Sequence, residues 1–279
     1  MAHAIEEEVK GHYSRSGLEQ VILDALVASG KNIDRLQPND LSPVDEFHTG
    51  GRQATVEFAE QLSVAPGMHL LDIGCGIGGP SRFFAVERGC RVTGIDLTED
   101  YVRTAAALAR RVGLDGKVTY RQASALSLPF EAGTFDGAYM MHVGMNIEDK
   151  PKLFREVFRV LRKGGWFAIF DVMRNSDGPL AYPVHWAAST DTSFVASPAE
   201  YRRGLEAAGF AITNERDRAD FARAFFRQVK EKLAESGGKP PPLGIHLLMK
   251  RDVPEKLANV IANLEKGLIA PTELIARSA

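Results

Sequence analysis

The 279-residue chain has few cysteines, little excess charge of either sign and no long apolar run. The two cysteines, Cys75 and Cys90, are too few for a disulfide framework or a zinc site, and they fit a reducing compartment. The net charge is −2 and the lysines and arginines are dispersed, so no basic stripe indicates a nucleic-acid partner. No window approaches the roughly 18 apolar residues of a membrane span, and the first residues lack a signal-peptide pattern. We therefore expect a cytoplasmic globular protein with no membrane span, no nucleic-acid partner and no metal site.

Short apolar runs alternate with amphipathic stretches between residues 68 and 173. This alternation predicts βαβ units and therefore a parallel sheet. Thr98 is a candidate N-cap of the second helix, and Gly113 a candidate stop signal. The expected strands are 68–74, 90–96, 117–123, 135–142 and 166–173, and the expected helices between them are 80–88, 98–112 and 150–161.

The regions on either side follow a different pattern. Residues 1–60 favour helices, with a loop at 37–43, and the proline-containing segment 174–200 is expected to pass over the sheet as a loop. The pattern then predicts a helix at 198–208, a strand at 211–217 and a last strand at 268–275. Between these two strands it predicts a helical insertion, with helices at 221–234 and 253–266 separated by a linker at 237–242.

A glycine-rich turn, residues 74–79, follows the first expected strand and precedes a helix. Gly74 and Gly76 would let the backbone approach a ligand closely, because they carry no Cβ. Asp96 ends the next strand about 20 residues later, where a carboxylate can hydrogen-bond both hydroxyls of a ribose. The turn is therefore a candidate nucleotide site.

The charge of Asp72 bears on which cofactor binds there. A carboxylate two residues before the first glycine would repel the pyrophosphate of a nicotinamide or flavin dinucleotide. It would attract S-adenosylmethionine, which presents an ammonium and a sulfonium instead. Asp72 could also cap the turn through backbone N–H groups, a role that fits either ligand.

Four segments together resemble the class I S-adenosylmethionine-dependent methyltransferases in order and spacing. They are LDIGCGIGG (71–79), GIDL (94–97), LPF with FDGAY (128–130 and 135–139) and VLRKGGWFAIFDV (160–172). The resemblance implies an α/β fold, with a Rossmann-like, seven-stranded, mostly parallel sheet and helices on both faces. We predict three parts: an N-terminal helical lid (1–60), a methyltransferase core (61–217 with 268–277) and a helical insertion that covers the active site (218–267).

A wider set of segments resembles the subgroup of sarcosine/dimethylglycine N-methyltransferases, whose cousins act on phosphoethanolamine and quinones. These segments are His12-Tyr13, FHTGGRQAT (47–55), HVGMNI (142–147) and YPVHW (182–186). The resemblance implies S-adenosylmethionine as cofactor, with Tyr13 folding over it from the lid and Thr49 meeting its carboxylate beside His48. Oligomerisation is open, and a homodimer is one alternative.

The resemblance also implies how the sheet edge holds the cofactor. Most relatives have aspartate at position 124, where it bonds the exocyclic amine of adenine, and glutamine is frequent at position 141. This chain has Ser124 and Met141, which are departures from the pattern. The implied cofactor residues of the core are Asp72, Gly74 and Gly76 at the methionine moiety, Asp96 at the ribose, Leu97, Ser124 and Ala125 around the adenine, and Met141.

Methyl transfer from a sulfonium needs alignment more than acid–base chemistry, since positioning supplies roughly 7–11 kcal/mol in favourable cases. His142, at the end of a strand, could accept a proton from the acceptor or could be a packed histidine. Asn146 could orient the acceptor. Tyr182, His185 and Trp186 are candidate substrate contacts, and the Tyr and Trp rings could hold an ammonium by cation–π attraction or pack the loop.

We therefore predict a methyltransferase acting on a small amine such as sarcosine or dimethylglycine. The alternative is C- or O-methylation of a quinone, a sterol or a natural product, with the phenylalanines of residues 221–226 lining a larger pocket. A nucleic-acid methyltransferase is disfavoured, because residues 141–144 lack the Asn/Asp-Pro-Pro-aromatic turn. A dinucleotide-dependent oxidoreductase and a cofactor-binding regulatory protein without catalysis are the remaining alternatives.

Overall fold

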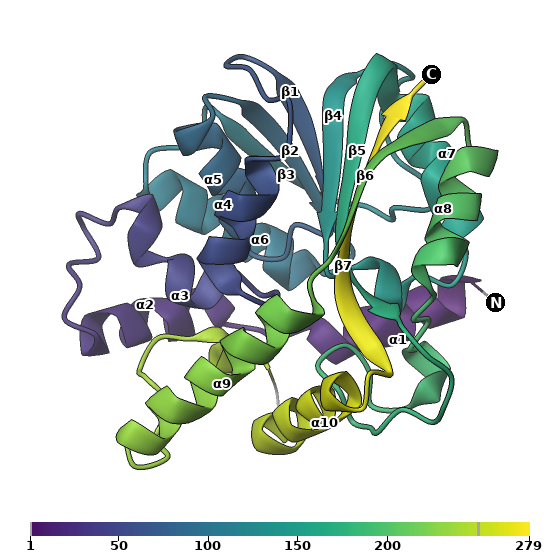
Figure 1. The fold of residues 1–279 in the computed structure, drawn as a ribbon. Helices are drawn as coiled ribbons and strands as arrows, with labels where there is room; N and C mark the ends of the chain where they lie inside the picture. Colours follow the sequence, from purple (N-terminus) through teal and green to yellow (C-terminus); the bar gives the residue numbers. More distant parts are fainter. Residues whose placement is uncertain (1, 250–251) are drawn as a thin grey trace.

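The computed structural model describes residues 2–249 and 252–279, and its centre is a seven-stranded sheet in the order β3-β2-β1-β4-β5-β7-β6 (Figure 1). Strands β1 to β5 pair in parallel, whereas β7 is antiparallel to both of its neighbours. The predicted fold class is thereby confirmed. The strands are β1 His69–Ile73, β2 Arg91–Asp96, β3 Val118–Gln122, β4 Phe135–Met141, β5 Leu161–Arg174, β6 Phe210–Asp217 and β7 Ile269–Ser278.

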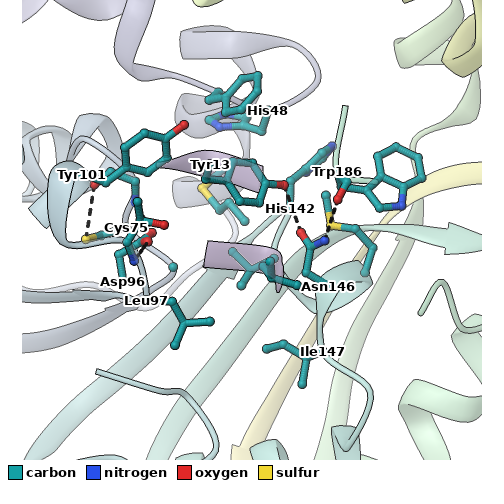
Figure 2. Close-up of a pocket in the computed structure, with 18 of the residues that line it drawn as sticks. Tyr13, His48, Cys75, Asp96, Leu97, Tyr101, His142, Asn146, Ile147 and Trp186 are labelled. Carbon is teal, nitrogen blue, oxygen red and sulfur yellow. Dashed lines mark hydrogen bonds between the residues drawn. The ribbon is translucent and has the colours of Figure 1, made fainter. Parts of the chain in front are cut away.

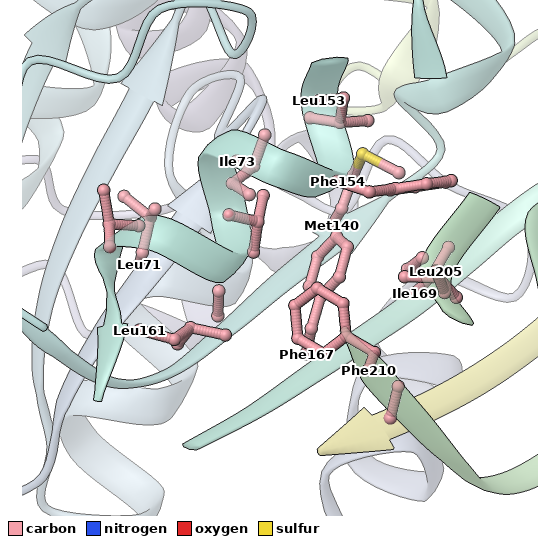
Figure 3. Close-up of a cluster of buried hydrophobic side chains, with 14 of the residues drawn as sticks. Leu71, Ile73, Met140, Leu153, Phe154, Leu161, Phe167, Ile169, Leu205 and Phe210 are labelled. Carbon is pink, nitrogen blue, oxygen red and sulfur yellow. The ribbon is translucent and has the colours of Figure 1, made fainter. Parts of the chain in front are cut away.

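Helices cover both faces of the sheet because the central strands are apolar on both sides. In β1, Leu70 packs into a cluster with α4 and α5, while Leu71 and Ile73 pack into the opposite cluster with α7 and α8 (Figure 3). Alternate residues of a strand point to opposite faces, so an apolar run buries both. The covering helices are α4 Gly51–Ala59, α5 Gly79–Glu87 and α6 Glu99–Arg111 on one face and α7 Lys150–Val160 and α8 Pro198–Ala207 on the other.

The remaining helices gather at one end of the sheet (Figure 1). They come from the N-terminal 60 residues and from the insertion between β6 and β7, which the sequence pattern predicted. Their position beyond the strand ends leaves them able to cover a site there. They are α1 Ala2–Tyr13, α2 Leu18–Ala28, α3 Ser42–Asp45, α9 Ala219–Glu235 and α10 Val253–Glu265.

One local prediction was wrong. The segment 37–43 is not an open loop but carries a 3₁₀ turn, η1 Pro38–Asp40, and the start of α3, because proline suits the first helical position and Asp40 Oδ2 accepts the Gln37 N–H at 2.9 Å. Thr98 occupies the N-cap position of α6, as predicted, although its side chain makes no capping hydrogen bond. Asp96 Oδ1 instead accepts the Thr98 N–H at 2.8 Å, which draws Asp96 into the turn.

The other short helical turns are η2 Gly144–Asn146, η3 Thr190–Thr192 and η4 Ile245–Leu247. Of these, η2 directly follows β4, and η3 lies within the long connection between β5 and α8, which runs over the sheet end as predicted. Within residues 2–249 and 252–279, no helix is both long and apolar enough to cross a membrane.

Candidate active site

A large cavity opens at the carboxyl ends of the parallel strands. It spans the boundary between β1 and β4, where the chain order of the sheet reverses, which is the usual ligand position in open α/β sheets. Figure 2 shows Asp96 and Leu97 on one side of the cavity, Asn146 and Trp186 on the other, and Tyr13 between them. The cavity therefore has two halves. The first lies against the nucleotide-type turn, and the second lies against the C-terminal helices.

The glycine turn forms the floor of the first half. Gly74 has φ 71°, and a Cβ there would come within 2.3 Å of the Val143 side chain, so only glycine fits. Gly76 has φ 52°, and a Cβ there would meet no protein atom within 4 Å. Since both glycines line the cavity, the turn offers bare backbone to a ligand. This arrangement fits a cofactor lying directly on the loop.

Asp96 is held in place by backbone donors of two turns. Its Oδ2 accepts the Gly76 N–H at 3.0 Å and its Oδ1 accepts the Thr98 N–H. Burial raises the pKa of this carboxyl above its usual value, and the two backbone hydrogen bonds oppose that shift. Each carboxylate oxygen keeps a further lone pair, and the side chain lines the cavity, so Asp96 can accept two hydroxyl donors of a ribose.

Asp72 lies beneath the turn and is only 2% exposed, yet it lines the cavity. Its Oδ2 accepts the Ser81 hydroxyl at 2.5 Å, whereas no described backbone N–H of the turn bonds to it, so a turn-capping role is not what the structure shows. Burial raises the pKa of Asp72 to about 7. A cation bound nearby would offset the cost of the buried charge.

The titration of Asp72 predicts how cofactor affinity changes with pH. Because the pKa of the carboxyl is raised to about 7, Asp72 is charged above pH 7 and becomes neutral as the pH falls through 7. The affinity for S-adenosylhomocysteine, which carries the same ammonium as the methyl donor, is expected to fall by several-fold between pH 8 and pH 6. Isothermal titration calorimetry at both pH values measures it. Asp72→Asn should bind weakly at both, and an unchanged pH dependence in this variant would refute the assignment.

His142 directly follows β4 with φ 56°, and both of its ring nitrogens are engaged. Nδ1 lies 3.3 Å from Phe170 O, and Nε2 lies 3.1 Å from Thr49 Oγ1 and 3.4 Å from Thr49 N. Burial lowers the pKa of His142 to about 3, with a further contribution from His48. A ring that holds Thr49 in place has little capacity left to take a proton from an acceptor. The contacts favour a positioning role for His142 over the catalytic one.

His48 lies next to His142, with their ring centroids 6.0 Å apart. Its Nε2 lies 3.1 Å from Gly51 O and 3.0 Å from Thr55 Oγ1, and the Thr55 hydroxyl is also 2.7 Å from a buried carboxylate oxygen of Glu46. Burial lowers the pKa of His48 to about 4, so the ring is neutral at pH 7. His48 and Thr49 both line the cavity, as predicted for a cofactor contact.

Asn146 connects the N-terminal helix to the loop after β5. Tyr13 donates its hydroxyl hydrogen to Asn146 Oδ1 at 3.0 Å, and Asn146 Nδ2 donates to Trp186 O at 2.8 Å (Figure 2). The neighbouring His12 contacts His185 O through Nε2 at 3.0 Å. These hydrogen bonds hold helix α1 across the cavity, and they occupy the Asn146 amide.

His185 lines the second half of the cavity, and its contacts differ from those of His142. Its Nε2 is buried and has no hydrogen-bond partner among the described residues. Burial lowers the pKa of His185 to about 4, and the nearby charge of Lys256 lowers it further. A neutral imidazole with an unpartnered nitrogen is a ready acceptor for a ligand O–H or N–H group.

Most of the predicted site residues converge on this one cavity. Two predicted residues, Ser124 and Tyr182, do not line it. Ser124 bonds to Glu6 beside the cavity, and Tyr182 packs among the apolar side chains around α10. The predicted residues that line the cavity are Tyr13, His48, Thr49, Asp72, Gly74, Gly76, Asp96, Leu97, Ala125, Met141, His142, Asn146, His185 and Trp186.

Several lining residues were missed by sequence reasoning. On α1, Ile5, Glu6 and Val9 share a face with Tyr13, and this helical spacing was the one available signal. Tyr101, whose buried hydroxyl has no hydrogen-bond partner in the described part of the chain, and Val260 line the cavity without a recognisable motif.

Comparison with known proteins agrees with the fold. Residues 71–169 match the family model of the methyltransferase domain. Phosphoethanolamine N-methyltransferase 1 of Arabidopsis thaliana is 33% identical over 185 residues, which are 66% of this chain and 36% of that protein. The 24-methylenesterol C-methyltransferase 2 of Oryza sativa subsp. japonica is 38% identical over 118 residues, 42% of this chain and 32% of that protein. The chain thus spans about a third of the length of these two relatives.

Among solved structures, the geranyl diphosphate C-methyltransferase of Streptomyces coelicolor A3(2), in complex with S-adenosyl-L-homocysteine, superposes with a TM-score of 0.71. The match covers 99% of this chain and 98% of that one at 17% identity, so it shows the fold. The sheet order, the glycine turn with Asp96, and the family match define a class I S-adenosylmethionine-dependent methyltransferase domain. The chain carries this domain, as its motifs predicted.

Proposed function

We propose that the protein transfers a methyl group from S-adenosylmethionine to an uncharged, largely apolar small molecule. The half of the cavity against the C-terminal helices, called the acceptor half below, carries this proposal. Its wall is built from buried or half-buried apolar side chains. They come from η2, the end of β5, the following loop and the C-terminal helices. The wall residues are Met145, Val172, Trp186, Phe225, Phe226 and Val260.

The charges around the cavity support an acceptor without an anionic group. The described lining residues include six carboxylates and neither lysine nor arginine. A carboxylate or a phosphate on the acceptor would lose its hydration there without gaining a cationic partner, and buried unpaired charges are costly. Sarcosine, dimethylglycine and phosphoethanolamine all carry such groups. The proposal therefore follows the alternative of the sequence analysis, the quinone, sterol or natural-product class.

The accepting atom is proposed to be a hydroxyl oxygen hydrogen-bonded to His185 Nε2. As this oxygen forms its bond to the methyl carbon, the carbon–sulfur bond breaks and its electron pair stays on sulfur. The hydroxyl proton passes to His185, which returns it to solvent. His185 is neutral at pH 7 and its nitrogen is unpartnered, and although its pKa of about 4 makes it a weak base, the oxygen becomes far more acidic than that as it is methylated.

A methyl-transfer screen tests the proposal. The protein is incubated with methyl-labelled S-adenosylmethionine and with phenols, quinols, sterols, sarcosine, dimethylglycine or phosphoethanolamine, and label in the extracted product is counted. We expect transfer to at least one phenol, quinol or sterol, at a kcat/KM at least 100-fold above that for the three amines. Transfer to sarcosine or dimethylglycine alone would contradict the apolar acceptor and support the amine.

A cytoplasmic location is also proposed. Both cysteines are free thiols and both are buried, which fits a compartment in which disulfides do not form.

A further inference from the structure

Helix α1 presents one face to the cavity. Ile5, Val9 and Tyr13 lie four residues apart, so they form a stripe along the helix, and Glu6 is adjacent to the first of them. All four line the cavity. Tyr13, at the end of the helix, reaches Asn146 at the boundary between the halves. The first turns of α1 therefore lie further along the cavity from this contact.

The carboxylate of Glu6 is positioned by the segment after β3. Ser124 donates its hydroxyl hydrogen to Glu6 Oε1, and Ser124 Oγ itself accepts the Leu126 N–H at 3.0 Å. The serine is thus fixed by its own turn and holds the glutamate by one oxygen. Glu6 Oε2 has no hydrogen-bond partner among the described residues. A carboxylate oxygen is therefore available at the β3 end of the cavity.

The surroundings of Glu6 suit a flat heterocycle that carries an amino group. Ribose hydroxyls at Asp96, on β2, direct the attached base toward β3, the next strand of the sheet. The cavity there is lined by apolar side chains that can contact the faces of a ring, with the Glu6 carboxylate at its edge. These apolar residues are Ile5, Val9, Leu97, Ala125 and Leu126.

We propose that Glu6 accepts a hydrogen bond from the exocyclic amino group of the cofactor adenine. This assignment rests on the proposed methyl donor and adds to it a base-recognition residue carried by the lid. Ser124, which does not line the cavity, acts as the positioning residue for Glu6. Because the contact joins α1 to the bound base, adenine recognition and lid closure become one event.

Calorimetry with two ligands tests this role without any turnover. The ligands are S-adenosylhomocysteine and S-inosylhomocysteine, in which a carbonyl oxygen replaces the amino group. We expect wild-type protein to bind the adenosyl compound at least 10-fold more tightly, because the carbonyl faces the Glu6 carboxylate. Glu6→Ala should weaken adenosyl binding about 10-fold and reduce the preference to near unity, since a hydrogen bond to a charged group is lost.

Two further variants make the result specific. Glu8→Ala removes an exposed carboxylate of the same helix and should leave both affinities unchanged. Ser124→Asp in the Glu6→Ala background places a carboxylate directly after β3 and should restore the preference for the adenosyl compound. Equal weakening of both ligands by Glu6→Ala, or no weakening, would overturn the proposal. Failure of the wild-type protein to bind S-adenosylhomocysteine would instead overturn the proposed function on which it rests.

Discussion

Asp96→Asn is expected to weaken the binding of S-adenosylhomocysteine about 100-fold. In the native site the carboxylate accepts two backbone N–H groups and has lone pairs left for two ribose hydroxyls. An asparagine offers one acceptor oxygen and turns an N–H₂ group toward donors, so at least one hydrogen bond to the ligand is lost and another donor is left unpaired. Hydrogen bonds to charged groups contribute about 1.5–3 kcal/mol each, and a loss of about 2.8 kcal/mol corresponds to 100-fold in affinity.

Calorimetry measures the affinity, and two controls separate binding from folding. Glu99→Gln changes an exposed carboxylate in the first turn of α6, the helix that follows Asp96, and should bind normally. Thermal unfolding of Asp96→Asn without ligand should show a folded protein with a cooperative transition. If Asp96→Asn binds as tightly as the wild type, Asp96 serves only the turn and the ribose assignment is wrong.

His185→Gln is expected to lower kcat about 100-fold on the best acceptor found in the screen. Glutamine retains a hydrogen-bonding amide of similar reach but cannot take up a proton, and general-base catalysis contributes 10²–10⁴-fold. KM for the acceptor should change by less than about five-fold, and the affinity for S-adenosylhomocysteine should be unchanged. A rise in KM at constant kcat would show that His185 only positions the acceptor.

The pH dependence of kcat gives an independent readout. Burial and the neighbouring positive charge of Lys256 lower the pKa of His185 to about 4. The nearby ring of His142 has a pKa of about 3, so it is also neutral at pH 7. The basic form of His185 is therefore complete above pH 5 and is lost as the pH falls through 4. The wild-type kcat should be flat from pH 6 to pH 8, whereas His185→Gln should follow the ionisation of the acceptor hydroxyl. His142→Gln, as a matched control, should affect cofactor affinity through Thr49 and leave this profile flat.

The order of strands and helices was predictable because each element buries a repeated pattern of apolar residues. The predicted strand 166–173 and the helix at 150–161 differ from the structure at their ends, since β5 begins at Leu161, directly after α7. The turn at Pro38 was missed because it depends on a single cap between Gln37 and Asp40. The division into lid, core and insertion stays a prediction.

The cofactor half of the site was predictable for a similar reason. Gly74, Gly76 and Asp96 lie within one βαβ unit, and their roles follow from local backbone geometry and from hydrogen bonds between adjacent turns. The acceptor half was less accessible. His142 and Asn146 were predicted to do chemistry, and the structure shows both engaged in holding other segments in place.

By itself, the sequence determined the class of domain, the nucleotide-type turn and the sheet, because these depend on residue types at short, regular spacings. The tertiary structure alone decided which polar groups are occupied and which remain available to a ligand. Tyr13 reaches Asn146 across 133 positions, and Glu6 reaches Ser124 across 118. Hydrogen-bond partners so distant in the chain leave no periodic pattern in it. For that reason the unpartnered nitrogen of His185 and the carboxylate of Glu6 are visible only once the chain is folded.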